Sequence, residues 1–111
     1  MSGSSPGASP LVVAAVQMVS TPDVADNLAA AGEGIAQAAA AGARLVLLPE
    51  YFCLMGRADT DKVAIRETDG EGPIQAFLAD AARRHGIWLV GGTLPLDAGD
   101  ATRVYNSSLV Y

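Results

Sequence analysis

The sequence predicts an α/β domain. Three short apolar runs, at residues 11–17, 44–48 and 87–92, predict β-strands, and the first of them suits a strand that is covered on both faces. Two longer stretches between these runs repeat apolar residues at helical spacing. Because a helix separates the first two of these strands, we expect these two to pair in parallel through a right-handed crossover.

The first helix is expected between the strands at residues 11–17 and 44–48. Thr21 is placed to act as its N-cap, with Pro22 at the first helical position, and Gly42 is a natural end. One apolar stripe follows steps of three and four residues along this helix: Val24, Leu28, Ala31, Ile35 and Ala38. The many alanines in this segment allow the helix to pack close to a sheet.

The second half of the chain begins with a long loop, residues 53–72, in which we expect a helical turn. Long ordered loops beside a strand end are often functional. Pro73 opens the second helix and Gly86 closes it. The apolar stripe of this helix consists of Ile74, Phe77, Leu78, Ala81 and Ala82.

The third strand, at residues 87–92, is followed by a turn at residues 97–100 and by a fourth strand at residues 104–111. The expected order is therefore β-α-β-α-β-β, without an internal repeat or an interdomain linker. Residues 1–10 are rich in Ser, Gly and Pro, and they predict a disordered leader rather than a signal peptide.

The composition excludes several classes of protein. The 111 residues are 50% apolar and 17% charged, with a mean hydropathy of +0.28, so we expect one face to meet another layer or subunit. The net charge of −5 argues against nucleic-acid binding, and no apolar segment has the length of a membrane span. The single cysteine, Cys53, excludes an internal disulfide and a cysteine-based zinc cluster. It favours a reducing compartment, and we expect the protein in the cytoplasm.

Glu50 is the most informative residue, because it follows the strand at residues 44–48 almost at once. The carboxyl ends of strands in α/β sheets are where ligands and catalytic groups collect, so we expect Glu50 to face a pocket and act as a general base. The structural alternative is that Glu50 accepts backbone N–H groups or pairs with Arg57. The adjacent aromatic residues Tyr51 and Phe52 favour the functional interpretation.

Other candidate residues have simpler structural explanations. Cys53 is best interpreted as a buried apolar residue, because nothing basic nearby activates it. His85 falls in the last turn of the second helix, where it complements the helix dipole, and Lys62 is expected to be a solvated surface charge. Residues 91–93, Gly-Gly-Thr, lack the lysine and following helix of a phosphate-binding loop. Asn106 could tie neighbouring strands or orient a loop.

Several short motifs, in order and at characteristic spacing, together resemble the N-terminal part of the nitrilase superfamily, the carbon–nitrogen hydrolases. The resemblance covers residues 11–111, which we therefore interpret as the N-terminal portion of such a domain, incomplete at its C-terminus. The matching motifs are Ala15–Met18, Asn27, Leu47–Phe52, Gly72–Pro73, Val90–Thr93 and Tyr105–Ser107.

The resemblance implies a four-layer α-β-β-α sandwich and a catalytic Glu-Lys-Cys triad that needs no metal or organic cofactor. Glu50 aligns with the family's glutamate, the general base, and Tyr51 and Phe52 would line or support the substrate pocket. In the family the lysine and the cysteine follow the strand that holds Asn106, beyond Tyr111. With only one member of the triad, this chain alone is expected to be inactive.

Residues 50–56 are most similar to the omega-amidase and deaminated-glutathione-amidase branch, whose members hydrolyse small amides such as 2-oxo-acid amides. The resemblance therefore implies a small amide substrate, release of ammonia through a thioester intermediate, and a homo-oligomeric parent enzyme. A nitrilase or a carbamoylase is the enzymatic alternative. A non-catalytic fragment that binds a partner through an uncovered sheet face is the alternative from another class.

Overall fold

A computed structural model describes residues 10–58 and 60–111 of the chain. The strands are β1 (Val13–Ala15), β2 (Leu45–Leu47), β3 (Trp88–Val90), β4 (Leu94–Asp97) and β5 (Val104–Ser107). The helices are α1 (Val24–Ala40), α2 (Asp61–Ala64) and α3 (Pro73–His85). Residues 1–9, which make up almost all of the predicted leader, lie outside the described residues.

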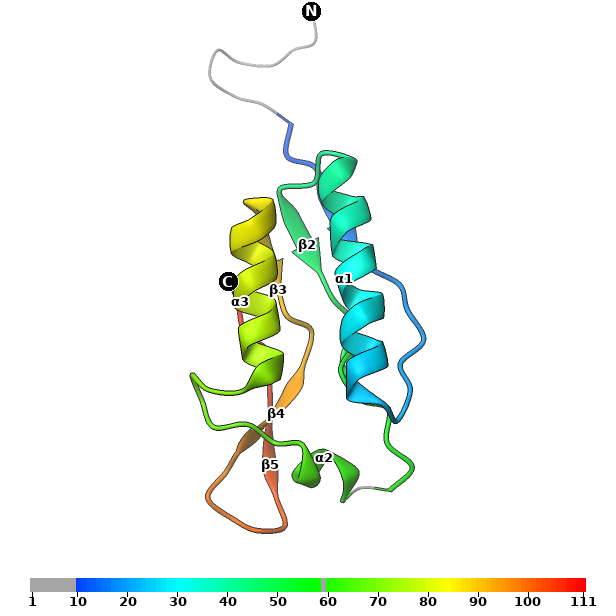
Figure 1. Cartoon of the computed structure of the whole chain (residues 1–111). Helices are drawn as coiled ribbons and strands as arrows, with labels where there is room; N and C mark the ends of the chain where they lie inside the picture. The colour runs from blue at the N-terminus through cyan, green and yellow to red at the C-terminus, as the bar shows by residue number, and fades with distance from the viewer. Residues whose placement is uncertain (1–9, 59) are drawn as a thin grey trace, which may run out of the picture.

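Strands β1, β2 and β3 form a parallel sheet in that order, which confirms the predicted β-α-β unit of β1 and β2 and adds β3 in parallel to β2. Val46 at the centre of β2 pairs with Ala14 on one side and Leu89 on the other. Helices α1 and α3 lie side by side in front of this sheet in Figure 1 and contact each other. None of the described helices has both the length and the apolar character needed to cross a membrane.

The two faces of the parallel sheet differ sharply in exposure. Val46 and Leu89, on the face that the helices cover, are fully buried. Leu47 and Trp88 point to the other face, where 36% and 66% of their surfaces are exposed. One helix layer and one sheet layer are thus present, which are two adjacent layers of the expected sandwich. The apolar open face accounts for part of the high hydropathy.

Helix α1 begins two residues later than predicted. Asp23, not Thr21, is the N-cap: its backbone is extended and its Oδ1 accepts the N–H of Asp26 at 3.0 Å. The Thr21 N–H instead donates to Oδ1 of Asn27 at 2.8 Å. Thr21 is therefore committed to the turn that precedes the helix, which leaves the cap to the aspartate.

The sequence-based interpretation missed strand β4 and made the last strand too long. β4 pairs with β5 as an antiparallel hairpin, and Pro95 within it weakens the strand pattern. After β5 the chain turns back to the parallel sheet, where the N–H of Tyr111 donates to the Leu89 carbonyl at 2.9 Å. The expected helical turn in the long loop is α2, and the predicted turn at residues 97–100 is confirmed.

Candidate active site at the end of strand β2

The turn that follows β2 is held by two hydrogen bonds, one to the last residue of β3 and one to the segment that follows β3. The N–H of Leu48 donates to the Val90 carbonyl at 3.0 Å. The N–H of Tyr51 donates to Oγ1 of Thr93 at 2.7 Å. Glu50 lies between these two anchored residues, at the carboxyl edge of the sheet, so its backbone position is fixed by β3 as well as by β2.

Close backbone approach and strain mark the same turn. Gly92 has a φ of +59°, and a Cβ at this position would overlap the carbonyl oxygen of Pro49. Only glycine allows the two chain segments to come this close. Tyr51 has a φ of +45°, in the left-handed region that bulky residues rarely adopt. Such backbone outliers gather at functional sites, where the surrounding structure enforces them.

The Glu50 side chain is exposed in the described chain, and its place in a pocket stays a prediction. Phe52 and Leu54 are buried and anchor the chain, which leaves Glu50 on the solvent side of the turn. Within residues 10–58 and 60–111, no hydrogen bond or ion pair engages its carboxylate, and the alternative pairing with Arg57 does not form. The carboxylate is accessible to a reacting group.

Tyr51 borders a hollow of about 230 Å³ that two basic side chains also line. These are Arg57 and Lys62. The Asp61 carboxylate lies beside the hollow, where its Oδ2 accepts the N–H groups of the lining residues Arg57 and Ala58 at 2.7 and 3.1 Å. The Nζ of Lys62 lies 5.1 Å from the centroid of the Tyr51 ring, which is cation–π geometry. Lys62 is therefore half-buried on an aromatic face, which corrects the expectation of a simple solvated charge.

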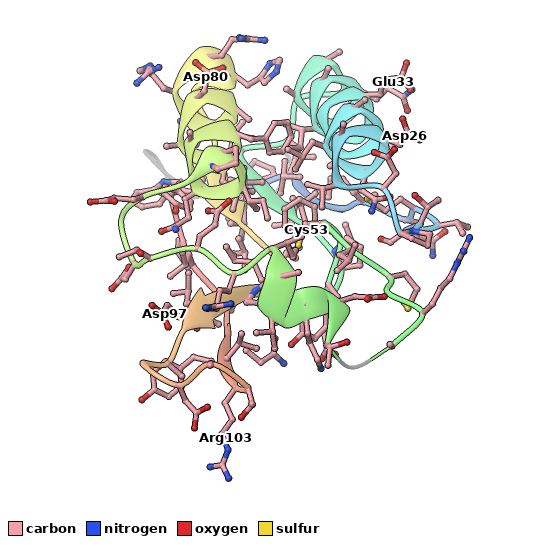
Figure 2. All side chains as sticks on the ribbon, turned by 60° about the horizontal axis from the view of Figure 1, so that its bottom comes forward. Asp26, Glu33, Cys53, Asp80, Asp97 and Arg103 are labelled. Atoms are coloured by element: carbon pink, nitrogen blue, oxygen red, sulfur yellow. The ribbon has the colours of Figure 1, made fainter. Side chains whose placement is uncertain are left out.

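Phe52 and Cys53 belong to the core. Both are fully buried, and the Phe52 ring packs at 6.5 Å from that of Phe77. Burial raises the pKa of the Cys53 thiol to about 11, so it stays neutral at physiological pH. Figure 2 shows Cys53 inside the molecule, beneath the two long helices. The structural interpretation of Cys53 is confirmed, and Phe52 can support a pocket only from behind.

Asn27 at the start of α1 ties down the segment that follows Glu50. Its Nδ2 donates to the carbonyl of Cys53 at 2.8 Å and to that of Thr21 at 2.7 Å. Ser20 adds a hydrogen bond from Oγ to the Phe52 carbonyl at 2.9 Å. A buried amide with all its hydrogen-bonding groups engaged makes this segment rigid.

Glu67 is a structural residue that the sequence-based interpretation missed. It is 6% exposed, and its carboxylate accepts the N–H of Ile74 at 2.6 Å and that of Gln75 at 3.0 Å. These are donors of the first turn of α3, so Glu67 caps this helix from the preceding loop. In the sequence, the only indication of this role was a carboxylate shortly before Gly72. In the structure, a Cβ on Gly72 would overlap the Glu67 side chain.

The remaining candidates lie apart from this turn. His85 falls in the last turn of α3, as predicted. Asn106 is exposed on β5 and pairs with Pro95 across the hairpin, and Figure 2 shows Arg103 at the outer tip of the same hairpin. Among residues 10–58 and 60–111, no three His, Cys, Asp or Glu side chains gather as a metal-ligand set.

Comparisons with known proteins agree on one family. The carbon–nitrogen hydrolase family matches residues 12–111. An omega-amidase of Arabidopsis thaliana is 36% identical over 98 residues, which cover 86% of this chain and 26% of that protein. A deaminated glutathione amidase of Synechocystis is 36% identical over 100 residues, covering 89% of this chain and 36% of that protein.

Solved structures show the same relationship in three dimensions. The Nit3 protein of Saccharomyces cerevisiae, a member of the nitrilase superfamily, matches 83% of this chain with a TM-score of 0.72 and 29% identity. The NitFhit protein of C. elegans matches 88% of this chain with a TM-score of 0.69 and 31% identity. This chain spans only 35% and 24% of those two chains, so it corresponds to one portion of each.

Proposed function

This chain belongs to the carbon–nitrogen hydrolase family, and from that membership we propose that it supplies the general base of an enzyme that hydrolyses small amides. The base is Glu50. The proposal concerns the complete protein of which these residues form the N-terminal portion, because the chain spans between 26% and 36% of the two amidases described above. The triad lysine and cysteine then come from sequence beyond Tyr111.

The chemistry uses one carboxylate twice. Glu50 takes the proton from the cysteine thiol while the sulfur attacks the amide carbon, and the lysine stabilises the oxyanion. The C–N bond then breaks, and the nitrogen receives the proton from Glu50 and leaves as ammonia. Water attacks the thioester, Glu50 takes a proton from it, and the acid leaves as the thiol is restored. No metal ion or organic cofactor enters this sequence.

The observation that carries the proposal is the placement of Glu50. An exposed carboxylate stands on a backbone that two hydrogen bonds and one close glycine contact fix at the carboxyl edge of a parallel sheet. A general base needs a fixed backbone position together with an accessible carboxylate oxygen. The buried thiol of Cys53, with its raised pKa, favours assigning the nucleophile to another cysteine.

The hollow beside Tyr51 supports a more specific proposal for the kind of amide that is hydrolysed. Arg57 and Lys62 line it, and the Asp61 carboxylate beside it is engaged by two backbone N–H groups. The two cationic side chains favour an amide that also carries an anionic group, such as a 2-oxo-acid amide. Tyr51 would border the bound substrate and Phe52 would support the hollow from the core. We further propose, from the resemblance alone, a cytoplasmic homo-oligomer.

The test is ammonia release by the complete protein from a panel of small compounds. The panel contains a neutral aliphatic amide, an amide that bears a carboxylate, a nitrile and a carbamoyl compound. We expect the carboxylate-bearing amide to react fastest, and Glu50→Gln to lower kcat by about 10³-fold or more. Turnover of the nitrile or the carbamoyl compound alone would instead support the alternative nitrilase or carbamoylase assignment.

Glu33→Gln is the matched control, because Glu33 is an exposed carboxylate on α1, and Figure 2 shows it pointing away from the rest of the molecule. We expect this variant to retain the rate of the unmodified protein. Full activity of Glu50→Gln would remove Glu50 from the mechanism. If no member of the panel is hydrolysed, the non-catalytic alternative, with a partner on the open sheet face, becomes the better account.

A further inference from the structure

The hydroxyl of Thr93 has a role that family membership does not assign. We propose that Thr93 is a positioning residue, which fixes the backbone from which the Glu50 side chain extends by holding the next peptide group. This inference rests on the proposed function of Glu50. It also gives a use to the Gly-Gly-Thr sequence at residues 91–93, which the phosphate-loop interpretation could not explain.

The first step is the hydrogen bond itself. The N–H of Tyr51 donates to Oγ1 of Thr93 at 2.7 Å, across 42 residues of sequence. A side-chain hydroxyl thus takes the place of a strand carbonyl at the point where regular pairing between β2 and β3 has ended. Hydrogen bonding between the β3 side of the sheet and the turn thereby extends three residues beyond Leu48.

Second, this hydrogen bond helps to hold Tyr51 in a strained backbone conformation. Tyr51 is held with a φ of +45°, a conformation that costs a bulky residue free energy and persists only where the surroundings enforce it. Thr93 restrains the backbone of Tyr51, and Lys62 lies over its ring with Nζ at 5.1 Å from the centroid. Gly92 admits the Pro49 carbonyl immediately beside this contact.

The third step connects Tyr51 to Glu50. The Glu50 carboxylate is exposed and makes no hydrogen bond with the described part of the chain, so nothing in residues 10–58 and 60–111 holds the side chain directly. The two peptide groups on either side fix the position of its Cα and the direction of its Cα–Cβ bond, and Tyr51 provides the second. Release of the Tyr51 N–H would let the turn relax and move the carboxylate. Small displacements of a catalytic group are costly for rate.

The experiment compares Thr93→Val with Thr93→Ser in the complete protein. Valine keeps the shape of threonine and removes the acceptor, whereas serine keeps the hydroxyl and removes a methyl group. We expect Thr93→Val to lower kcat for the best amide by about 30-fold with KM changed less than about twofold. Thr93→Ser should stay within about threefold of the unmodified protein, and exposed Thr68→Val should behave as unmodified.

A double variant separates positioning from general structural damage. Combined with Glu50→Gln, Thr93→Val should lower the residual rate no further, because a residue that acts through Glu50 has no effect once that carboxylate is gone. If Thr93→Val lowers the rate by the same factor in the Glu50→Gln enzyme as in the unmodified enzyme, the inference is overturned. A Thr93→Val enzyme with full kcat would also overturn it, as would a Thr93→Ser enzyme as impaired as the valine variant. If Thr93→Val does not fold, Thr93→Ala replaces it in each comparison.

The outcomes also separate this inference from the proposed function. An active Glu50→Gln enzyme would overturn the proposed function, and the role of Thr93 with it. An inactive Glu50→Gln enzyme together with a fully active Thr93→Val enzyme would overturn only the role of Thr93. Loss of kcat in both variants, with recovery in Thr93→Ser, supports both.

Discussion

Two carboxylates, Glu50 and Glu67, stand in contrasting regions of this molecule. Glu67 is 6% exposed and its oxygens accept two backbone N–H groups at the start of α3. Glu50 is exposed on the turn after β2, and no hydrogen bond from the described chain engages its carboxylate. A carboxylate whose acceptor sites are filled is a structural part of the fold, whereas one held only through its backbone remains accessible to a reacting proton.

The largest expected effect on stability comes from Glu67→Gln. The new amide group would face a backbone N–H of Ile74 or Gln75, so a buried donor would lose its acceptor. We expect the free energy of unfolding to fall by about 2–3 kcal/mol. Thermal or denaturant unfolding of the complete protein measures this. A loss below about 0.5 kcal/mol would show that the hydrogen bonds of Glu67 do not secure the loop before α3.

A second prediction concerns the close contact beneath Glu50. Gly92→Ala adds a Cβ where the Pro49 carbonyl lies, and it also strains a backbone with a φ of +59°. Gly99→Ala is the matched control, because Gly99 also has a positive φ, of +76°, but its Cβ would meet no atom within 4 Å.

We expect Gly99→Ala to cost about 1 kcal/mol, the backbone strain alone, and Gly92→Ala to cost about 1 kcal/mol more. The difference between the two melting curves isolates the contact. Gly92→Ala should also lower kcat, whereas Gly99→Ala should not. Equal destabilisation by both substitutions would show that the turn adapts easily and that its position is not tightly set.

These outcomes bear on how far the sequence alone specifies this structure. Apolar periodicity predicted strands β1 to β3, the parallel pairing of β1 with β2 and both long helices, because each depends on local patterns that tertiary packing reinforces. The hairpin partner β4 was missed because Pro95 weakens its local pattern, and pairing with β5 becomes visible only in three dimensions.

The candidate site was predicted less completely than the fold. The position of Glu50 after a buried strand identified it, but its exposure depends on how Phe52 and Leu54 anchor the turn. The hydrogen bond between Tyr51 and Thr93 spans 42 residues, and no local sequence pattern encodes such a contact. Likewise, the contact between Lys62 and the Tyr51 ring depends on the folded conformation of the loop between them.

The smallest effect is expected from Cys53→Ser at neutral pH, where turnover should be nearly unchanged. The pKa of the buried thiol is raised from 9.0 to about 11, whereas an unfolded chain ionises near the ordinary value. The thiol therefore has little effect on the pH dependence of stability below about pH 8. Between about pH 9 and 11 it lowers the free energy of unfolding by up to about 1.4 kcal/mol per pH unit.

Denaturant unfolding across this pH range measures the contribution of the thiol. Cys53→Ser should remove that part of the alkaline loss, so the curves of the two proteins should differ in slope. Parallel curves would show that the thiol ionises as easily in the folded protein as in the unfolded chain. Complete loss of turnover in Cys53→Ser would show that this cysteine, and not one outside the described chain, is the nucleophile.

The most direct test of the contrast between the two carboxylates is the unfolding free energy of Glu50→Gln, measured beside that of Glu67→Gln on the same preparation used for ammonia release. We predict that the inactive Glu50→Gln protein unfolds within about 0.5 kcal/mol of the unmodified protein. A Glu50→Gln protein as unstable as Glu67→Gln would contradict the account, because Glu50 would then be a second structural carboxylate.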